Sequence, residues 1–162
     1  MTNKSKRTGR EAENAVAAQL VARGAYPDAE PRALFGINDR GDISGTGTLV
    51  FQVKGGKAAE QASHNQVKAW LADAERQREN ARAHFAVLVI KRAGFGAKRV
   101  GMWRAFTTVR TLDYFLALTD GCHHETLLPE ELEDEPIEMT FDAMITLLQG
   151  AALAQKPLPN EL

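Results

Sequence analysis

The sequence has almost no cysteine and no long apolar run. Its single cysteine, Cys122, cannot form a disulfide within the chain, which excludes a disulfide-stabilised scaffold and indicates a reducing compartment. No stretch reaches the apolar length that crosses a bilayer, and the N-terminus lacks the apolar segment of a signal peptide. We therefore expect a cytoplasmic protein that does not enter a membrane, in the host cytoplasm if a phage encodes the chain.

Basic residues are nearly absent after position 110. Residues 1–110 hold 19 Lys and Arg against 10 Asp and Glu, a net charge of +9, whereas residues 111–162 hold one basic and 11 acidic residues, a net charge of −10. The basic part predicts a polyanionic partner. For the acidic part three interpretations stay open: it covers the basic face as a DNA mimic, it recruits another partner, or it only aids solubility.

The remaining composition suits one α/β domain. The 162 residues are 44% hydrophobic and 25% charged, enough to bury a sizeable core. Helix patterns at 8–23, 63–83, 112–118 and 141–154 alternate with extended or strand patterns at 26–33, 41–44, 49–54, 85–90 and 100–106. This order predicts a mixed central β-sheet flanked by helices. We assign residues 1–118 to the core and residues 119–162 to an acidic linker and a C-terminal helix, packed on the core or at a dimer interface.

The first helix carries an acid without an evident structural role. Thr8 and Glu11 fit a capping box, in which Thr8 starts the helix and Glu11 reaches back to it. Gly24 then stops the helix. Glu13 lies on the face that should turn inward, where an acid is costly unless it is paired or binds a metal. Its position alone leaves open whether it reaches water instead.

Polar side chains converge in the stretch from 39 to 57. The short strand 41–44 and the strand 49–54 are joined by a glycine-rich turn, which predicts a hairpin. Because side chains of a strand alternate between faces, Gln52 and Lys54 share the face opposite the apolar row, and Asp42 can reach it. An acid, an amide oxygen and a lysine at one place indicate a metal-dependent site.

The apolar strand 85–90 ends in a glycine-punctuated basic loop. Either its cations contact phosphates or the loop is only a solvated turn; its position at the end of a central strand favours phosphate contacts. Such contacts confer affinity and salt dependence without reading bases. The candidate DNA-binding residues are Lys57, Lys91, Arg92, Lys98 and Arg99.

The order Glu13, Asp42 and Gln52-x-Lys54 on helix, hairpin and strand resembles the PD-(D/E)xK nuclease superfamily. Within it, the chain is most similar to Holliday-junction-resolvase-like endonucleases, including small ones of actinobacterial phages. The segments A-E-P-R-A, D-R-G-D-I and V-I-K-R-A-G add to the likeness, which covers roughly residues 8–116. The resemblance implies a restriction-endonuclease-like core.

The resemblance also implies a function: metal-dependent hydrolysis of DNA, with four-way junctions or branched DNA as substrate. Asp42, Gln52 and the Val53 carbonyl would bind Mg²⁺ or Mn²⁺, and Glu13 would join directly or through water. Lys54 would orient the attacking water or stabilise the charge that develops on phosphorus. Symmetric cutting of two strands implies a homodimer.

Gln52 departs from this pattern, because the superfamily usually has Asp or Glu at that position. An amide oxygen can bind a hard cation but adds no charge, so Asp42 and Glu13 alone supply a formal charge of −2. Metal affinity should fall, although related nucleases with Gln at this position exist in the superfamily. Two alternatives stay open: a duplex endonuclease of the restriction or repair type, which keeps the chemistry and changes the substrate, and a nuclease fold that binds DNA without cutting it, with Gln52 as the loss.

Two weaker patterns complete the sequence. Ser63 and Gln66 form a second capping box, so Gln66 is expected as a cap partner and only alternatively as an accessory residue of the site. The run Cys-His-His-Glu at 122–125 lacks the separated ligand pairs of a structural zinc site, and a solvated loop is the favoured interpretation.

Overall fold

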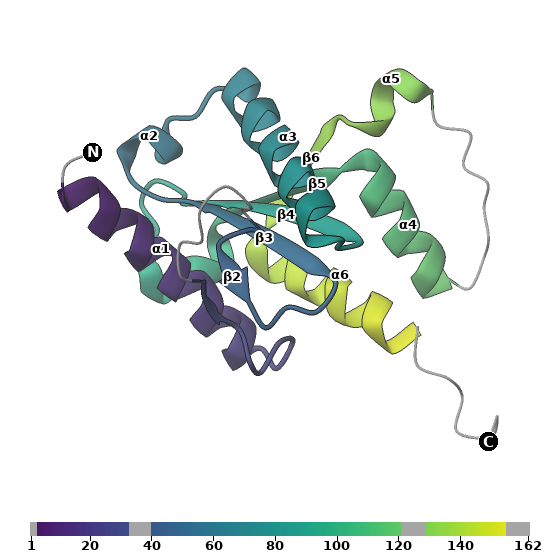
Figure 1. Ribbon diagram of the computed structural model, residues 1–162, viewed down its shortest axis with the longest axis horizontal. Helices are drawn as coiled ribbons and strands as arrows, with labels where there is room; N and C mark the ends of the chain where they lie inside the picture. Colours follow the sequence, from purple (N-terminus) through teal and green to yellow (C-terminus); the bar gives the residue numbers. More distant parts are fainter. Residues whose placement is uncertain (1–2, 33–39, 121–128, 155–162) are drawn as a thin grey trace.

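The computed structural model describes residues 3–32, 40–120 and 129–154 (Figure 1). The elements are, in chain order, α1 (Asn3–Ala22), β1 (Glu30–Pro31), β2 (Ile43–Ser44), β3 (Leu49–Lys54), α2 (Lys57–Glu60), α3 (His64–Ala81), β4 (Phe85–Ile90), the 3₁₀ helix η1 (Ala97–Met102), β5 (Arg104–Thr108), α4 (Val109–Asp120), α5 (Glu130–Glu133), β6 (Pro136–Thr140) and α6 (Phe141–Ala154).

The main sheet is mixed, as the sequence predicts. Its strand order is β3-β4-β5-β6, in which β3 pairs with β4 in parallel and the other two pairings are antiparallel. The short strands β1 and β2 form a separate two-stranded sheet. The molecule is thus an α/β protein with a mixed four-stranded sheet flanked by helices, and β3 lies at one edge of that sheet.

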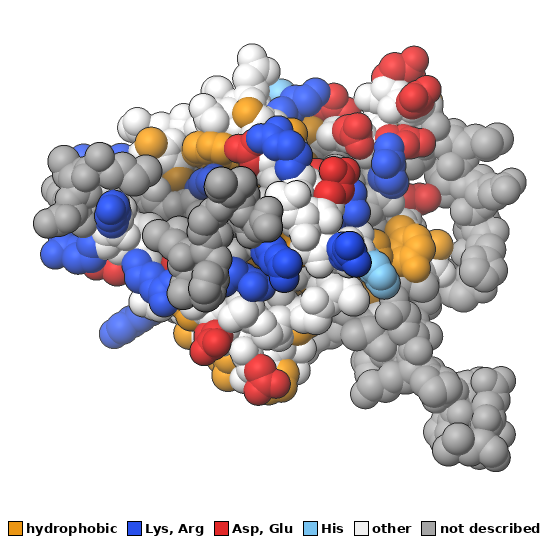
Figure 2. Space-filling model, viewed as in Figure 1, with side chains coloured by type: hydrophobic (Ala, Val, Ile, Leu, Met, Phe, Trp, Pro, Cys, Tyr) orange, Lys and Arg blue, Asp and Glu red, His pale blue; other side chains and the backbone are white. Residues whose placement is uncertain are grey.

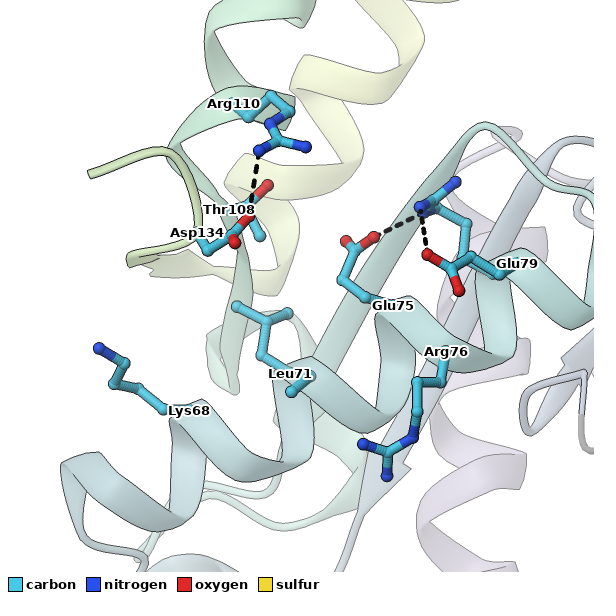
Figure 3. A pocket seen from close by; sticks show the side chains of 10 residues that line it. Lys68, Leu71, Glu75, Arg76, Glu79, Thr108, Arg110 and Asp134 are labelled. Atoms are coloured by element: carbon cyan, nitrogen blue, oxygen red, sulfur yellow. Dashed lines mark hydrogen bonds and ion pairs between the residues drawn. The ribbon is translucent and has the colours of Figure 1, made fainter. Parts of the chain in front are cut away.

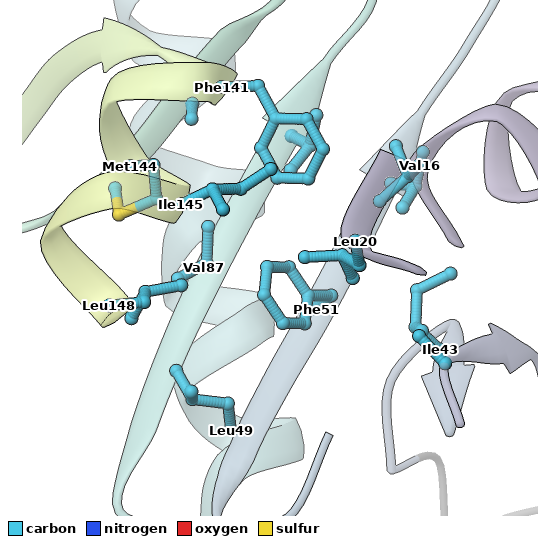
Figure 4. Close-up of a cluster of buried hydrophobic side chains, with 14 of the residues drawn as sticks. Val16, Leu20, Ile43, Leu49, Phe51, Val87, Phe141, Met144, Ile145 and Leu148 are labelled. Atoms are coloured by element: carbon cyan, nitrogen blue, oxygen red, sulfur yellow. The ribbon is translucent and has the colours of Figure 1, made fainter. Parts of the chain in front are cut away.

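Two hydrophobic clusters cover the two faces of the sheet. The larger cluster joins α1 and α6 to one face, and Figure 4 shows Phe51 of β3 between Leu20 of α1 and the side chains of α6. The Phe51 ring packs edge-on against Phe141, with 6.3 Å between ring centres. The smaller cluster joins α3 to the opposite face through Leu88 and Ile90. Both faces of β3 are therefore covered.

Several elements have the bounds that the sequence predicts. The apolar run Phe85–Ile90 forms β4, a central strand buried on both faces, and the final helix spans Phe141–Ala154. α3 begins after Ser63, whose Oγ accepts a hydrogen bond from the Gln66 N–H at 3.3 Å. Gly24 closes α1 with a φ of +67°, the left-handed conformation that glycine adopts without a Cβ penalty.

The predicted start of α1 is wrong, because the helix begins at Asn3 and Thr8 lies inside it. No proline interrupts the preceding turn, and Arg7 pairs with Glu11 across one helical turn at 3.4 Å. Glu11 is therefore an exposed ion-pair partner in the helix and not part of a capping box.

The predicted hairpin is also wrong in its pairing. β2 pairs with β1, Pro31 lying opposite Ile43, and does not join β3 in one ladder. The extended character predicted for residues 26–33 explains this result, because that segment offers β2 an antiparallel partner. One backbone hydrogen bond, from the Asp42 N–H to the Phe51 carbonyl at 2.8 Å, still ties the segment before β2 to β3.

The strand predicted at 100–106 begins later than expected. Val100 and Gly101 belong to η1, and β5 runs from Arg104 to Thr108. Gly101 lies against Asp142 so closely that a Cβ would come within 2.3 Å of the carboxylate. This close contact fixes η1 against the start of α6, so that β5 begins only after η1.

The sequence predicts a loop throughout 121–138, but the structure has α5 and β6 in its described part. β6 is an edge strand with proline at its first position, where no ladder N–H is needed. Because acidic residues surround β6, its sequence does not show the alternation of apolar and polar residues that predicts a strand. Arg104 of β5 binds Glu138 of β6 through two hydrogen bonds of 2.8 and 2.9 Å, and these hydrogen bonds lower the pKa of Glu138.

Two smaller differences concern length and coverage. The helix predicted at 112–118 is longer and spans Val109–Asp120. The Cys-His-His-Glu run at 122–125 lies outside the described residues. Of the helices that the structure describes, none is both long and apolar enough to cross a bilayer.

Candidate active site

Asp42 binds the outer edge of β3. Its Oδ2 accepts a hydrogen bond from the Val53 N–H at 2.6 Å, and its own N–H donates to the Phe51 carbonyl at 2.8 Å. A hydrogen bond from an amide to a carboxylate is short and strong because the acceptor is charged. The carboxylate of Asp42 is thereby fixed at the level of Val53, between Gln52 and Lys54 in the chain.

A glycine allows this close approach. Gly41 has a φ of +90°, and a Cβ there would lie 2.7 Å from Cγ1 of Val50 and 3.0 Å from the Phe51 carbonyl oxygen. Any other residue at position 41 would push the segment away from the strand. The sequence D-R-G-D therefore brings Asp42 to β3 because Gly41 precedes it.

The Val53 carbonyl lies on the same side of β3 as Asp42. In a strand, the N–H and C=O of one residue point to the same neighbour, and the Val53 N–H points to Asp42. The carbonyls of Phe51 and Val53 therefore both point to the outer edge of the sheet. One of the predicted metal ligands, a main-chain oxygen, is thus directed towards the Asp42 segment.

Gln52 and Lys54 face α3. They pair in register with Leu88 and Ile90 of β4, which pack against α3, and residues in register share a face. Gln52 is 4% exposed, and its Oε1 has no hydrogen-bond partner among the residues that the structure describes. A buried acceptor without a donor costs about 1–3 kcal/mol, so this oxygen is suited to a ligand that accepts its lone pairs.

Lys54 is half-buried, and its Nζ lies 5.8 Å from the centre of the Trp70 ring on α3. The distance is that of a cation–π contact, which holds the ammonium in place without an acidic partner. Lys54 forms no ion pair with any residue that the structure describes. Its charge is therefore available to an anion at the end of β3.

Glu13 is connected to the site through an arginine. Its Oε2 lies 3.1 Å from Nη1 of Arg10, and the same nitrogen donates to the Arg32 carbonyl at 3.0 Å. The Arg32 N–H donates in turn to the Asp42 carbonyl at 2.7 Å. The carboxylate of Glu13, with 22% of its side chain exposed, is thus held near the Asp42 segment by Arg10.

α1 also crosses the chain directly after Lys54. A Cβ on Gly55 would lie 2.8 Å from Cβ of Ala12 and 3.0 Å from the Thr8 carbonyl oxygen, so only glycine fits beneath the helix. The helix face that carries Thr8 and Ala12 therefore lies against the residue that follows β3, and Glu13 is the next residue of the helix.

Sequence reasoning missed Arg10 and Arg32. Arg10 stands three residues before Glu13, the spacing at which two side chains of a helix meet, so the ion pair itself could have been read from the sequence. The hydrogen bonds from Arg10 to the Pro31 and Arg32 carbonyls could not have been read from the sequence, because they depend on where β1 lies.

The oxygen donors fit a hard divalent cation. The Asp42 carboxylate, the buried amide oxygen of Gln52 and the Val53 carbonyl are the donor types that Mg²⁺ and Mn²⁺ accept. Within residues 3–32, 40–120 and 129–154, no three His, Cys, Asp or Glu side chains gather as a metal-binding group. A cation here would thus rely on an amide and main-chain oxygen in addition to acids.

The other predicted residues lie around this end of the sheet with different surroundings. The Gln66 side chain is exposed, and its backbone N–H is the group that Ser63 caps. Lys57 is exposed at the first position of α2. Lys91 is bound to Glu60 at 2.8 Å. Arg92, Lys98 and Arg99 are exposed on the loop between β4 and β5, which includes η1.

Charge is unevenly distributed over the surface. In Figure 2 Lys and Arg side chains lie over α1 and across the middle of the molecule, whereas Asp and Glu gather over α5. Glu130, Glu131 and Glu133 belong to α5, and Glu133 pairs with Arg110. Glu135, after α5, pairs with Lys68 of α3. Glu133 and Glu135 of the acidic segment thus contact α4 and α3.

A second hollow of about 410 Å³ lies between α3 and the start of α4 (Figure 3). Its charged side chains bind one another, as in the pairs Arg78–Glu75 at 2.6 Å and Arg110–Asp134 at 3.5 Å. One carboxylate oxygen of Glu75, Oε1, is buried there without a hydrogen-bond partner among the described residues, but the other, Oε2, pairs with Arg78. Because the charged side chains of this hollow neutralise one another, it is the weaker candidate for chemistry.

Comparisons with known proteins add nothing to this geometry: no protein-family model, no curated protein and no solved structure matches the chain.

Proposed function

We propose that the protein is a metal-dependent DNA endonuclease that hydrolyses phosphodiester bonds, with four-way junctions or other branched DNA as substrate. One observation carries the proposal: on the strand whose edge is bound by the Asp42 carboxylate, the buried Oε1 of Gln52 lacks a hydrogen-bond partner within the described part of the chain. We infer the reaction from the resemblance to PD-(D/E)xK nucleases and the oxygen ligands of the metal ion from the geometry.

Asp42, Gln52 and the Val53 carbonyl would hold Mg²⁺ or Mn²⁺, and Glu13 would contribute from α1. The bound ion would polarise a phosphate oxygen and lower the pKa of the attacking water. The Asp42 carboxylate is already oriented by the Val53 N–H, so it would need little rearrangement to bind the metal ion as well. Glu13 is held by Arg10, which fixes the carboxylate and offsets part of its charge.

Lys54 would stabilise the negative charge that develops on the phosphate in the transition state. Its ammonium lies against Trp70 and lacks an acidic partner among the described residues, so it is not neutralised in advance. A preorganised cation contributes more to the transition state than one that must first leave a partner. Exposed cations near this end of the sheet, Lys57 and the loop after β4, would bind the flanking phosphates.

A second candidate function is DNA binding without cleavage. Two observations favour it: position 52 carries a neutral amide, and Glu13 is occupied by the Arg10 guanidinium. Both reduce the negative charge that would attract a cation. In this case the basic surface would still bind DNA.

Incubation with Mg²⁺ or Mn²⁺ and labelled four-way junction, flap and linear duplex separates these functions. Paired cuts near the branch point support junction cleavage, cuts in the linear duplex indicate a restriction or repair substrate, and binding without cuts supports the second candidate. Under the first proposal, Asp42→Asn and Lys54→Ala abolish cleavage and leave DNA binding within about threefold, because a single phosphate contact is a small share of the total.

Gln66→Ala serves as the matched control, because Gln66 is exposed and only its backbone caps α3. It should cut like the unmodified chain. Cleavage that persists in both Asp42→Asn and Lys54→Ala would place the catalytic centre elsewhere in the molecule.

A further inference from the structure

The loop after β4 holds two arginines against one phenylalanine. Cζ of Arg92 lies 5.0 Å and Cζ of Arg99 4.4 Å from the centre of the Phe95 ring. A guanidinium is attracted by the face of an aromatic ring, and the contact uses its own flat face. The N–H donors, which lie in the plane of the guanidinium, stay available to another partner.

Hydrogen bonds fix the backbone beneath these side chains. The Phe95 carbonyl accepts from Nε1 of Trp103 at 2.9 Å, and Trp103 is 2% exposed in the core. The Phe95 N–H donates to the Arg92 carbonyl at 3.2 Å, and the Arg99 N–H donates to the Gly96 carbonyl at 2.9 Å. The two arginines therefore project from an ordered loop.

No acid of the described chain binds either guanidinium. Other cations nearby are paired: Lys91 binds Glu60, and Arg104 binds both oxygens of Glu138. The charge of Arg92 contributes to the lowered pKa of Glu138 only as a secondary cause, after the hydrogen bonds from Arg104. Two like charges at one ring repel each other, and a polyanion would relieve that repulsion.

The loop lies at the same end of the sheet as the candidate active site. β3 and β4 are parallel, with Lys54 in register with Ile90. The Lys91 N–H donates to the Lys54 carbonyl at 2.9 Å, so the loop begins beside the last residue of β3. The loop therefore leaves the sheet at the end that carries the candidate active site.

We propose that Arg92 and Arg99, oriented by Phe95, form a clamp for the phosphate backbone of DNA beside the candidate active site. The inference rests on the proposed function and adds which cations hold the substrate. A guanidinium forms two parallel hydrogen bonds with a phosphate, and prior orientation reduces the entropy that binding removes. Lys91, bound to Glu60, has a structural role instead.

The test is DNA binding, measured by fluorescence anisotropy with the Asp42→Asn chain so that no cleavage occurs. Labelled junction and duplex are titrated between about 50 and 200 mM salt. Arg92→Gln and Arg99→Gln should each reduce the slope of log affinity against log salt by about 0.9, the value for one lost phosphate contact. Phe95→Leu should weaken binding about threefold with little change in slope, because it removes only the orienting ring. Phe95→Tyr keeps the ring and should bind like the parent.

Arg76→Gln is the matched control, because it removes one exposed arginine charge from α3, where Arg76 pairs with Asp73. Losses at Arg76 that equal those at Arg92 and Arg99, or Phe95→Leu binding like Phe95→Tyr, would overturn the clamp. Melting curves that match the parent show that each variant is folded.

The same experiment separates the clamp from the proposed function. Binding that depends on Arg92 and Arg99, together with an unmodified chain that cuts no DNA in Mg²⁺ or Mn²⁺, supports the clamp and refutes the nuclease. Cleavage that proceeds with binding unaffected by the arginine variants refutes the clamp alone. A preference for RNA of the same form, lost in the same variants, would overturn the assignment to DNA.

Discussion

At the scale of the residue, Gln52 combines burial with an amide oxygen that has no donor among the described residues. It lies on the α3 face of an edge strand. A glutamate there would bring a third carboxylate to the two supplied by Asp42 and Glu13. It would also be a buried charge, which is costly unless a cation binds it.

The stability of the Gln52→Glu variant should therefore depend on a bound metal ion. In EDTA the variant should melt several degrees below the parent, because about 1–3 kcal/mol is lost when a buried carboxylate is unpaired. Mg²⁺ should restore the melting temperature, since the added charge strengthens ion binding. If the nuclease proposal holds, cleavage should reach half its maximum at a lower Mg²⁺ concentration than in the parent.

Gln77→Glu is a suitable control for burial, because Gln77 is 7% exposed on α3. Its melting temperature should fall in EDTA without recovery in Mg²⁺. A Gln52→Glu chain that Mg²⁺ does not stabilise, or that loses cleavage at every metal concentration, would remove position 52 from the ligand set.

At the scale of the element, the turn between β2 and β3 depends on one glycine. Gly45 has a φ of +75°, and a Cβ there would lie 2.0 Å from the Asp28 carbonyl oxygen. The atom in the way belongs to the backbone, so it cannot rotate aside. Gly47, two residues later, has a φ of +61° and open space around it.

Gly45→Ala should destabilise the fold much more than Gly47→Ala. The alanine at 45 combines a strained φ with a backbone overlap and should cost roughly 3 kcal/mol or more, whereas the alanine at 47 should cost only about 1 kcal/mol. Urea unfolding gives both free energies. Equal losses would mean that the contact between Gly45 and Asp28 is not close.

Elements with strong local patterns were predictable from the sequence. The run Phe85–Ile90 is apolar at every position because both faces of a central strand are buried, and Ser63 marks the start of α3 because its hydroxyl caps the helix. The sequence did not predict β6, because an edge strand among acidic residues shows neither a continuous apolar run nor a capping residue. Its pairing with β5 depends on Arg104 meeting Glu138, a contact that sequence spacing does not reveal.

The candidate site shows the same division between local patterns, which were predictable, and tertiary contacts, which were not. The alternation of β3 predicts that Gln52 and Lys54 share a face, and their register with β4 agrees. The separation of β2 from β3 was not predictable, because it depends on pairing with Glu30–Pro31 across a loop. The bond from Asp42 to the Val53 N–H and the role of Arg10 are tertiary contacts of the same kind.

At the scale of the whole molecule, the C-terminal part completes one sheet and one core. β6 covers the edge of β5, and α6 buries Phe141, Met144 and Ile145 against the same cluster as α1. The apolar face of α6 is thus occupied within its own chain, and a dimer would need another surface.

A fragment of residues 1–120 should therefore fail to fold. It would lose β6 and α6 and expose the apolar side chains of α1 and of the sheet that α6 covers. We expect a poorly dispersed NMR spectrum and no cooperative melting, in contrast to the full chain under the same conditions. A fragment that melts cooperatively would show that the first part is an independent domain.

The position of Asp42 has one more consequence. An edge strand with open hydrogen-bonding groups invites strands of other molecules to pair with it, which leads to aggregation. Here Asp42 occupies two of the outward groups, the Phe51 carbonyl and the Val53 N–H, and hinders that addition. The residues proposed for chemistry thus also protect the protein from self-association, and changes at Gly41 that loosen the Asp42 segment should reduce solubility as well as activity.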